Sequence, residues 1–220
     1  KRPQRLQTRY ASHMPEDQAV TFKAKFEQEL SAAEAQLAPD TVKVLICDGA
    51  RSIWKYAEKN DRFDGYEKLV DYWHTLEHLS LAAEALFGKS AKEAGDWYDR
   101  YADKLLDEDD GAARVLRSMD YHARTLRLSP ARRLDINRQR VYFVNNGSRM
   151  RYAEFRRRGL PIGSGPVEAA CKSLIKTRLC RSGMRWSKEG GQAVLALRTY
   201  VKSNRWDCFW KHVNELERVA

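Results

Sequence analysis

The chain has 220 residues, of which 43% are apolar and 32% are charged, and its formal net charge is +10. This length and composition are typical of a globular protein with one large domain, or one and a half small ones. No apolar run approaches the roughly 20 residues that cross a bilayer, and residues 1–50 show no secretory signal, so we expect neither a membrane protein nor a secreted one. We expect a cytoplasmic protein, and the missing initiator Met predicts that Lys1 is a cut or processed end.

In the first third of the chain, the patterns alternate between strand and helix. Phe22, Phe26 and Leu30 recur at helical spacing and predict a helix with one apolar face. The β-branched run TVKVLIC predicts a buried strand that ends at Asp48-Gly49. The elements expected in order are a short strand (5–10), a helix (16–37), the buried strand (41–47), a short helix with Trp54 (50–59) and a second strand (66–72) whose apolar residues also fit a helix.

From His74 onward the pattern is helical. The expected helices are 74–87, an acidic stretch at 88–111, 112–128, part of 131–150, 167–179, 190–203 and 206–218. The predicted fold class is therefore α/β and mostly helical. We expect three segments: residues 1–72 with the strands, an all-α insertion at 73–158, and C-terminal helices at 159–220.

Positive charge is concentrated in one part of the sequence. Residues 124–188 contain 17 Lys or Arg against three acidic residues, whereas the remainder of the chain has 23 basic and 27 acidic residues. Such a concentrated field favours an anionic polymer as partner, and nucleic acid is the usual one. The alternative is a solvated basic face that serves solubility.

The four cysteines show no CxxC pair and no histidine at zinc-ligand spacing. Cys47 follows an apolar run and Cys171 lies on the apolar face of a predicted helix, so both are expected to be small buried hydrophobes. We expect a reducing compartment and no structural zinc.

Asp48 is the first candidate for chemistry, because it directly follows the predicted buried strand. Ligands of open α/β sheets bind beyond the carboxyl ends of strands. A carboxylate there suits Mg²⁺, which prefers oxygen ligands and retains several waters. The alternative is an ordinary Asp-Gly turn.

Glu168 is the second candidate, because it stands in the first turn of an otherwise basic helix. Gly163-Ser164-Gly165-Pro166 is a typical helix start, so the acid could simply suit the positive end of the helix dipole. Its helical spacing to Lys172 and Lys176 instead predicts a carboxylate at the rim of the apolar face with cations below it. In that reading a divalent metal and a phosphate backbone meet at Glu168.

Three further motifs have open interpretations. Asp71, His74 and His78 share a helical face and could form a zinc site, although a structural hydrogen-bonded pair explains them as well. Arg181 to Ser187 holds two arginines and Trp186, which could stack on an unpaired base or fill a core between helices. Arg156-Arg157-Arg158 contacts phosphate or forms a solvated face.

Two long stretches combine these motifs in a specific way. They are VLICDGARSIWKYAEKNDRFDGYEKLVDYWHTLEHL and GLPIGSGPVEAACKSLIKTRLCRSGMRWSKEGGQAVLALR. Through them the chain resembles the bacterial insertion-sequence transposases of the DDE type, specifically the Kra group, from about Tyr10 to Tyr200. The resemblance implies a ribonuclease H-like core, here partial and interrupted by the all-α insertion. It also implies cleavage and joining of DNA with two Mg²⁺ (or Mn²⁺) ions held by two Asp and one Glu.

The resemblance assigns roles to individual residues. Asp48 in CDGA matches the second catalytic Asp and Glu168 in GPVEAACK matches the catalytic Glu, so both become metal ligands. Asp71 and His74 match an accessory D-x-x-H element. The residues implied to bind DNA, both transposon ends and target, are Lys172, Lys176, Arg178, Arg181, Arg185 and Trp186.

The chain departs from the family pattern at the first catalytic Asp. None of the acids before Asp48 is predicted to lie in a strand, so the chain resembles the C-terminal portion of a longer transposase. We therefore expect weak metal binding and little activity from this chain alone. Besides DNA, further copies of the chain are a candidate partner, in a homo-oligomer.

Two other functions compete with this one. The first is a non-catalytic helical protein that binds DNA or RNA through the basic surface. The second is an interaction role for the acidic helical block at 93–110, which would need an apolar patch of Trp97, Tyr98 and Leu105.

Overall fold

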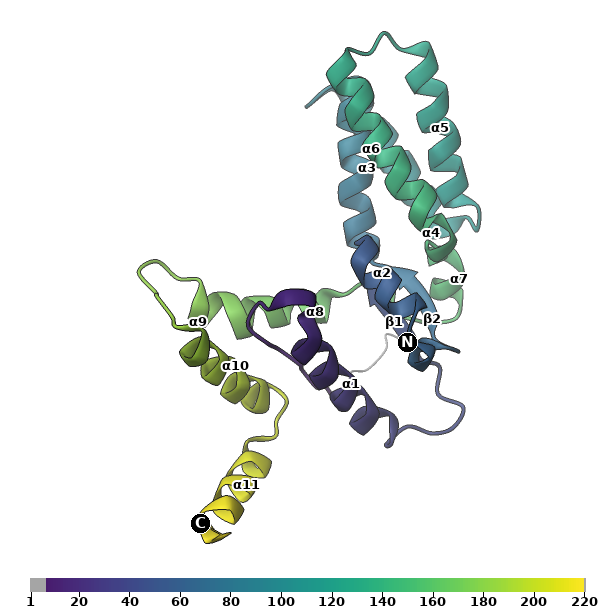
Figure 1. The fold of residues 1–220 in the computed structure, drawn as a ribbon. Coiled ribbons are helices and arrows are strands. Elements are labelled where there is room, and N and C mark those ends of the chain that lie inside the picture. The colour runs from purple at the N-terminus through teal and green to yellow at the C-terminus, as the bar shows by residue number, and fades with distance from the viewer. Residues whose placement is uncertain (1–6, 220) are drawn as a thin grey trace. The chain divides into compact units, whose positions relative to one another are not determined.

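A computed structural model describes residues 7–219, which are mostly helical with two parallel strands (Figure 1). The described residues divide into two compact units. The first unit spans Val42–Ser164, and the second combines residues 7–41 with residues 165–219. None of the helices in the described part of the chain has the length and apolar character of a membrane span.

The first unit begins with a small parallel sheet. β1 (Val44–Cys47) pairs with β2 (Glu67–Val70), with Val44 opposite Glu67 and Cys47 opposite Val70. Because parallel strands cannot be joined by a tight turn, α2 (Arg51–Glu58) and a 3-10 turn (Asp61–Phe63) form the crossover. The predicted strand at 41–47 is thus shorter and only half-buried, and within the predicted 66–72 the strand is residues 67–70.

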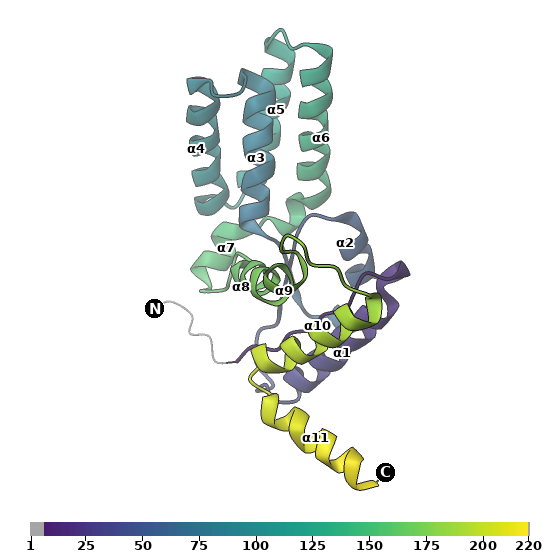
Figure 2. The same ribbon diagram turned by 90° about the vertical axis from the view of Figure 1, so that its left-hand side faces the viewer.

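Four antiparallel helices extend from the sheet as a bundle (Figure 2). They are α3 (Tyr72–Phe87), α4 (Lys92–Asp107), α5 (Gly111–Thr125) and α6 (Pro130–Asn146). Ser129 caps α6 and Pro130 occupies its first turn, where its missing N–H costs nothing. One continuous core joins the bundle to β2, because Leu69 belongs to the same buried cluster as Leu79 and Phe143.

A helix that the sequence analysis missed returns the chain to the sheet. After a 3-10 turn (Gly147–Arg149), α7 (Tyr152–Arg157) buries Tyr152 and Phe155. Three arginines come directly after Phe155, at the end of α7. They form ion pairs with carboxylates of the same unit rather than remaining available for phosphate. These ion pairs are Arg156 with Asp107 at 2.5 Å, Arg157 with Asp109 at 2.7 Å, and Arg158 with Glu67 at 2.6 Å.

The second unit is built from helices with shallow packing. Its elements are a 3-10 turn (Asp17–Ala19), α1 (Val20–Glu34), α8 (Gly165–Ala170), a π-helical turn (Cys171–Lys176), α9 (Thr177–Leu179), α10 (Lys188–Lys202) and α11 (Trp206–Val219). The predicted strand at 5–10 is wrong over its described residues, 7–10. The segment that follows is tied to α10 by side chains, with Tyr10 N–H donating to Ser203 Oγ at 3.1 Å and Ser12 Oγ lying 2.7 Å from Thr199 Oγ1.

Burial bears on three of the sequence interpretations. α1 has no buried residue, and Phe22 on its expected apolar face is 37% exposed. Cys171 is exposed rather than buried. Trp97 and Leu105 are buried inside the bundle, so they offer no apolar patch for the interaction role suggested for the acidic block.

Candidate functional site

The carboxyl ends of β1 and β2 place two aspartates at one edge of the sheet. Cys47 and Val70 are partners in the register, and Asp48 and Asp71 follow them directly. The Asp71 N–H donates to the Cys47 carbonyl at 2.8 Å, which extends the pairing by one step. Asp48 therefore directly follows a strand, as predicted, and Asp71 is its neighbour on the next strand.

Asp48 is held by its own turn and by α2. Its Oδ1 accepts a hydrogen bond from the Ala50 N–H at 2.9 Å, and its carbonyl accepts one from Trp54 Nε1 at 2.8 Å. The Arg149 guanidinium lies 4.5 Å from the Trp54 ring centroid and covers it. Asp48 is half-buried, and within residues 7–219 its Oδ2 has no hydrogen-bond partner. One carboxylate oxygen thus closes an Asp turn, while the other is available to a ligand.

Both carboxylate oxygens of Asp71 instead accept hydrogen bonds from backbone N–H groups. Its side chain is 1% exposed, its Oδ1 accepts from the His74 N–H at 2.9 Å as the N-cap of α3, and its Oδ2 accepts from the Ser164 N–H. The Tyr72 N–H donates to the Ile162 carbonyl at 3.0 Å in the same place. Asp71 therefore fixes both the start of α3 and the segment that leads into the Glu168 helix.

The accessory histidines have partners other than a metal. His74 Nδ1 lies 3.2 Å from Glu77 Oε2, and His78 Nδ1 lies 2.7 Å from Gln139 Oε1. Burial lowers the pKa of His78, the His74 charge lowers it further, and the Gln139 hydrogen bond and Glu77 partly oppose the shift. In the described part of the chain, no group of three or more His, Cys, Asp or Glu side chains is arranged to hold a metal ion.

Tyr142 on α6 lies beside the same edge of the sheet, against Gly49, although the sequence analysis did not select it. Its ring stacks on His78 at 3.5 Å between centroids, and its hydroxyl lies 3.4 Å from Thr75 Oγ1. Burial raises the pKa of Tyr142 to about 12, and Asp48 and Asp71 add to the shift against the lowering effect of the Thr75 hydrogen bond. The hydroxyl is thus protonated at neutral pH and can donate a hydrogen bond but cannot act as a base.

Gly49 shows how closely Tyr142 approaches the strand end. A Cβ at Gly49 would lie 2.1 Å from the Tyr142 ring, which is closer than any real contact. Only glycine therefore lets the aromatic ring cover the backbone beside Asp48. The Asp-Gly pair marked a turn in the sequence, but nothing local could show that a ring 93 positions later occupies the space.

Glu168 lies in the second unit, in the first turn of α8, and its side chain is exposed. The expected alignment of Glu168 with Lys172 and Lys176 assumed an α-helix, whereas residues 171–176 form a π-helical turn. The wide turn frees backbone carbonyls, and Arg198 of α10 donates to two of them, at Ser173 and, at 3.0 Å, Leu174. Such turns are frequent at functional sites in helices.

The residues predicted to bind DNA are all exposed in the second unit. They are Lys172, Lys176, Arg178, Arg181, Arg185 and Trp186. Trp186 is 42% exposed, so it does not fill a core between helices. Within residues 7–219, none of the five cations forms an ion pair with a carboxylate.

The donor chemistry of the two candidate acids fits Mg²⁺ better than zinc. Asp48 and Glu168 supply carboxylate oxygens, which a hard divalent cation prefers, and Asp48 keeps one oxygen for such a ligand. They belong to different units of the chain. Asp71 does not fit as a ligand, since both of its oxygens accept backbone hydrogen bonds. Comparison of the whole chain with protein-family models, with curated proteins and with solved structures finds no match.

Proposed function

We propose that this chain is part of the catalytic region of a DNA transposase that cuts and joins DNA by metal-dependent phosphoryl transfer. The observation that carries the proposal is the place of Asp48, half-exposed at the carboxyl edge of two parallel strands with one carboxylate oxygen available. Ligand sites of open α/β sheets occupy this edge. In this proposal the β1–α2–β2 unit belongs to a ribonuclease H-like core.

The chain's own residues would contribute positioning and charge. Asp48 and Glu168 would hold Mg²⁺, which when bound activates the attacking oxygen and stabilises the leaving one. Asp71 keeps the start of α3 and the segment before Glu168 in place through its two backbone hydrogen bonds. Tyr142 covers the backbone beside Asp48 and limits access of water from that side.

The exposed cations of residues 172–185 would contact the phosphates, with Trp186 stacking on a base or packing along the sugar edge. Because each neutralised phosphate releases counterions, DNA binding should weaken with a log–log salt slope of about 0.9 per contact. A salt-independent affinity would contradict this part of the proposal.

Within residues 7–219, the family's third carboxylate has no counterpart in a strand before Asp48. Among the described residues the two strands are β1 and β2, and no acid of residues 7–47 lies in a strand. We therefore propose weak metal binding and little strand transfer by the chain alone. Robust Mg²⁺-dependent DNA cleavage that Asp48→Ala abolishes would contradict this expectation.

Manganese binding measured by water-proton relaxation tests the proposal without requiring activity. Asp48→Asn and Glu168→Gln should each lower Mn²⁺ binding in the presence of DNA. The matched controls are Asp64→Asn, an exposed acid in the first unit, and Glu189→Gln, which like Glu168 is an exposed acid in the first turn of a helix. Equal losses in the controls would reject the metal site.

A non-catalytic DNA-binding protein is the second candidate function. The observation that favours it is the exposed, unpaired state of the cations at 172–185, which needs no metal. This function predicts DNA affinity that is the same in EDTA and in Mg²⁺ and is unaffected by Asp48→Asn. The transposase proposal predicts that Mg²⁺ strengthens binding and that Asp48→Asn removes this increase.

A further inference from the structure

The far end of the bundle carries a separate group of cations, here called the bundle tip. It consists of the turns at 88–91 and 126–129 and the adjoining helix ends, which lie together in Figure 2. Contacts across the helices confirm that these ends meet. Arg132 donates to the carbonyls of Ala85 at 2.7 Å and Leu86 at 2.5 Å, and the rings of Phe87 and His122 are 5.0 Å apart.

The bundle tip carries more cations than acids, with Glu84 and Glu93 at its α3 and α4 ends. Residues 121–134 contain four arginines and no acidic residue. The exposed cations of the tip are Lys89, Lys92, Arg124, Arg127 and Arg133. None of these five forms an ion pair with a carboxylate anywhere in residues 7–219, and Arg133 donates only to the Leu128 carbonyl, at 3.3 Å.

Elsewhere in the same unit, many of the arginines are matched with acids. At the opposite end of the bundle, Arg114 and Arg117 share Asp110, at 2.8 and 3.0 Å. On α6 itself, Arg138 pairs with Asp135 at 3.0 Å, and Arg140 pairs with Asp120 at 2.7 Å. Among the described residues, unpaired cations of this unit also occur at α2 and α4, at Arg51, Lys55, Lys59 and Arg100, but the tip gathers five of them at one end of the bundle.

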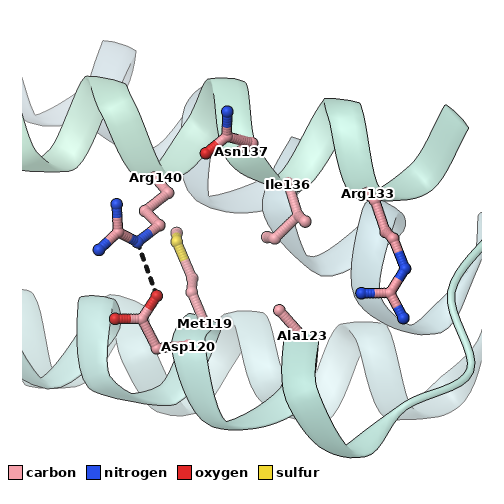
Figure 3. A pocket seen from close by; sticks show the side chains of 7 residues that line it. All are labelled: Met119, Asp120, Ala123, Arg133, Ile136, Asn137 and Arg140. Atoms are coloured by element: carbon pink, nitrogen blue, oxygen red, sulfur yellow. Dashed lines mark hydrogen bonds and ion pairs between the residues drawn. The ribbon is translucent and has the colours of Figure 1, made fainter. Parts of the chain in front are cut away.

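A pocket of about 180 Å³ between α5 and α6 shows this change from matched to unmatched charge (Figure 3). At one end of the pocket Arg140 is engaged with Asp120, while at the other end Arg133 extends toward α5 without a carboxylate. Met119, Ala123 and Ile136 form the apolar floor between them. Arg133 thus lies at the edge of the tip, at the end of the pocket away from Asp120, and donates to the Leu128 carbonyl.

Like charges held together repel one another, and this lowers the stability of the folded state. Arginine and lysine that lack acids in the fold are the groups that neutralise phosphates in nucleic-acid complexes. We infer that the bundle tip binds the sugar–phosphate backbone of duplex DNA. The inference rests on the proposed function for the identity of the polyanion, but it needs neither Asp48 nor Glu168.

The length of α3 sets the distance of this contact from the acidic edge. Asp71 caps the first turn of α3 and Phe87 is its last residue, and 16 helical residues span about 24 Å. That length corresponds to about seven base pairs of duplex at 3.4 Å each. DNA that reaches both places must therefore extend at least this far beyond the edge that holds Asp48.

The test measures binding of a duplex of about 25 base pairs by the full chain in EDTA, so that no metal chemistry contributes. The tip variant combines Arg124→Gln, Arg127→Gln and Arg133→Gln. The control variant removes the same charge from paired positions, Arg117→Gln, Arg138→Gln and Arg156→Gln. Circular dichroism and thermal unfolding check that both variants fold as the parent does.

We expect the tip variant to lower DNA affinity by a factor on the order of ten, and to reduce the salt slope by about two to three. The control should change affinity less than twofold, and on a short duplex of about ten base pairs the two variants should differ less. Equal affinity of the tip variant and the parent, or equal losses in both variants, would overturn the inference. A parent that binds DNA without any tip effect rejects only the bundle tip, whereas a parent that does not bind DNA rejects the proposed function as well.

Discussion

The two units of this chain differ in how they use apolar and charged side chains. Every residue of the main buried cluster lies between Leu69 and Phe155, in the first unit. Among the described residues of the second unit, Ala170, Leu174 and Leu195 are the fully buried apolar side chains. Since burial of apolar area provides most of the folding free energy, the first unit has far more to stabilise it.

Ion pairing also differs between the two units, although unpaired cations occur among the described residues of both. Most arginines of the first unit meet carboxylates, whereas the cations at 172–185 in the second unit are exposed and unpaired. The unpaired cations of the first unit include those of the bundle tip, which resembles the second unit in this respect. Packing and ion pairing thus separate surfaces that maintain the fold from surfaces that are open to an anionic partner.

Removing a large side chain from the main core should have the greatest effect and is the strictest check of this contrast. Phe143→Ala should lower the free energy of unfolding by about 3–5 kcal/mol, because the ring is fully buried and leaves a cavity. Val144→Ala on the same helix is the control and should cost less than about 0.5 kcal/mol, since Val144 is exposed. Hydrogen exchange should show lost protection in α3–α7 but not in α10. Equal loss in α10 would mean that the units share their stability.

The next largest effect should come from Asp71, whose buried carboxylate accepts two backbone hydrogen bonds. Asp71→Ala should cost about 2–4 kcal/mol in urea unfolding, since hydrogen bonds to a charged group contribute roughly 1.5–3 kcal/mol each. The amides of His74 and Ser164 should exchange faster. Asp64→Ala, an exposed acid, should leave both rates unchanged. Unchanged exchange at Ser164 in Asp71→Ala would show that the carboxylate does not anchor that segment.

Adding a methyl group at Gly49 tests the packing beside Asp48. Gly49→Ala should cost about 1–3 kcal/mol, because its Cβ would collide with a Tyr142 ring that is stacked on His78. Gly147→Ala is the control, because it has open space and helical backbone angles and should be neutral or stabilising by up to about 1 kcal/mol. Thermal unfolding of the two variants separates these outcomes. A neutral Gly49→Ala would mean that Tyr142 moves freely.

The smallest effect concerns pH and His78. The pKa of this residue is lowered in the folded state by burial, so the unfolded chain takes up a proton first as the pH falls. The stability that neutral His78 contributes is therefore fully present above the unfolded pKa of about 6.5. It is lost as the pH falls toward the lower pKa of the folded state. Urea unfolding should show that the free energy of unfolding falls less between pH 7.5 and pH 5.5 for His78→Gln than for the parent. Burial also lowers the pKa of His122, so this residue still contributes part of the pH-dependent loss of stability in His78→Gln. An identical decrease would contradict this assignment.

Local sequence patterns were sufficient where an element depends on its own residues. The helix with buried Trp54, the strand that ends before Asp48, and the helix break at Ser129-Pro130 were all predicted from neighbouring residues. They form as expected because turn chemistry, capping and apolar runs act over a few positions.

Contacts between distant residues could not be predicted in this way. Tyr142 meets Thr75 across 67 positions, and Tyr10 meets Ser203 across 193, and no periodicity encodes either pair. The exposure of Cys171 was missed for a related reason, because its apolar neighbours suggested a buried face, whereas only Leu174 of that face is buried and Val167 is exposed. The candidate site was therefore predicted as separate residues, whereas its geometry required the fold.

The wide turn at 171–176 changes the angular positions, about the helix axis, of the side chains that follow it in the helix. A π-helical turn accommodates one more residue than an α-helical one, so later side chains are rotated about the axis as though a single amino acid had been inserted. Deleting one residue there would restore ordinary winding and reorient Arg178 relative to Glu168. The phase between the acid and the cations behind it is thus set by one surplus residue.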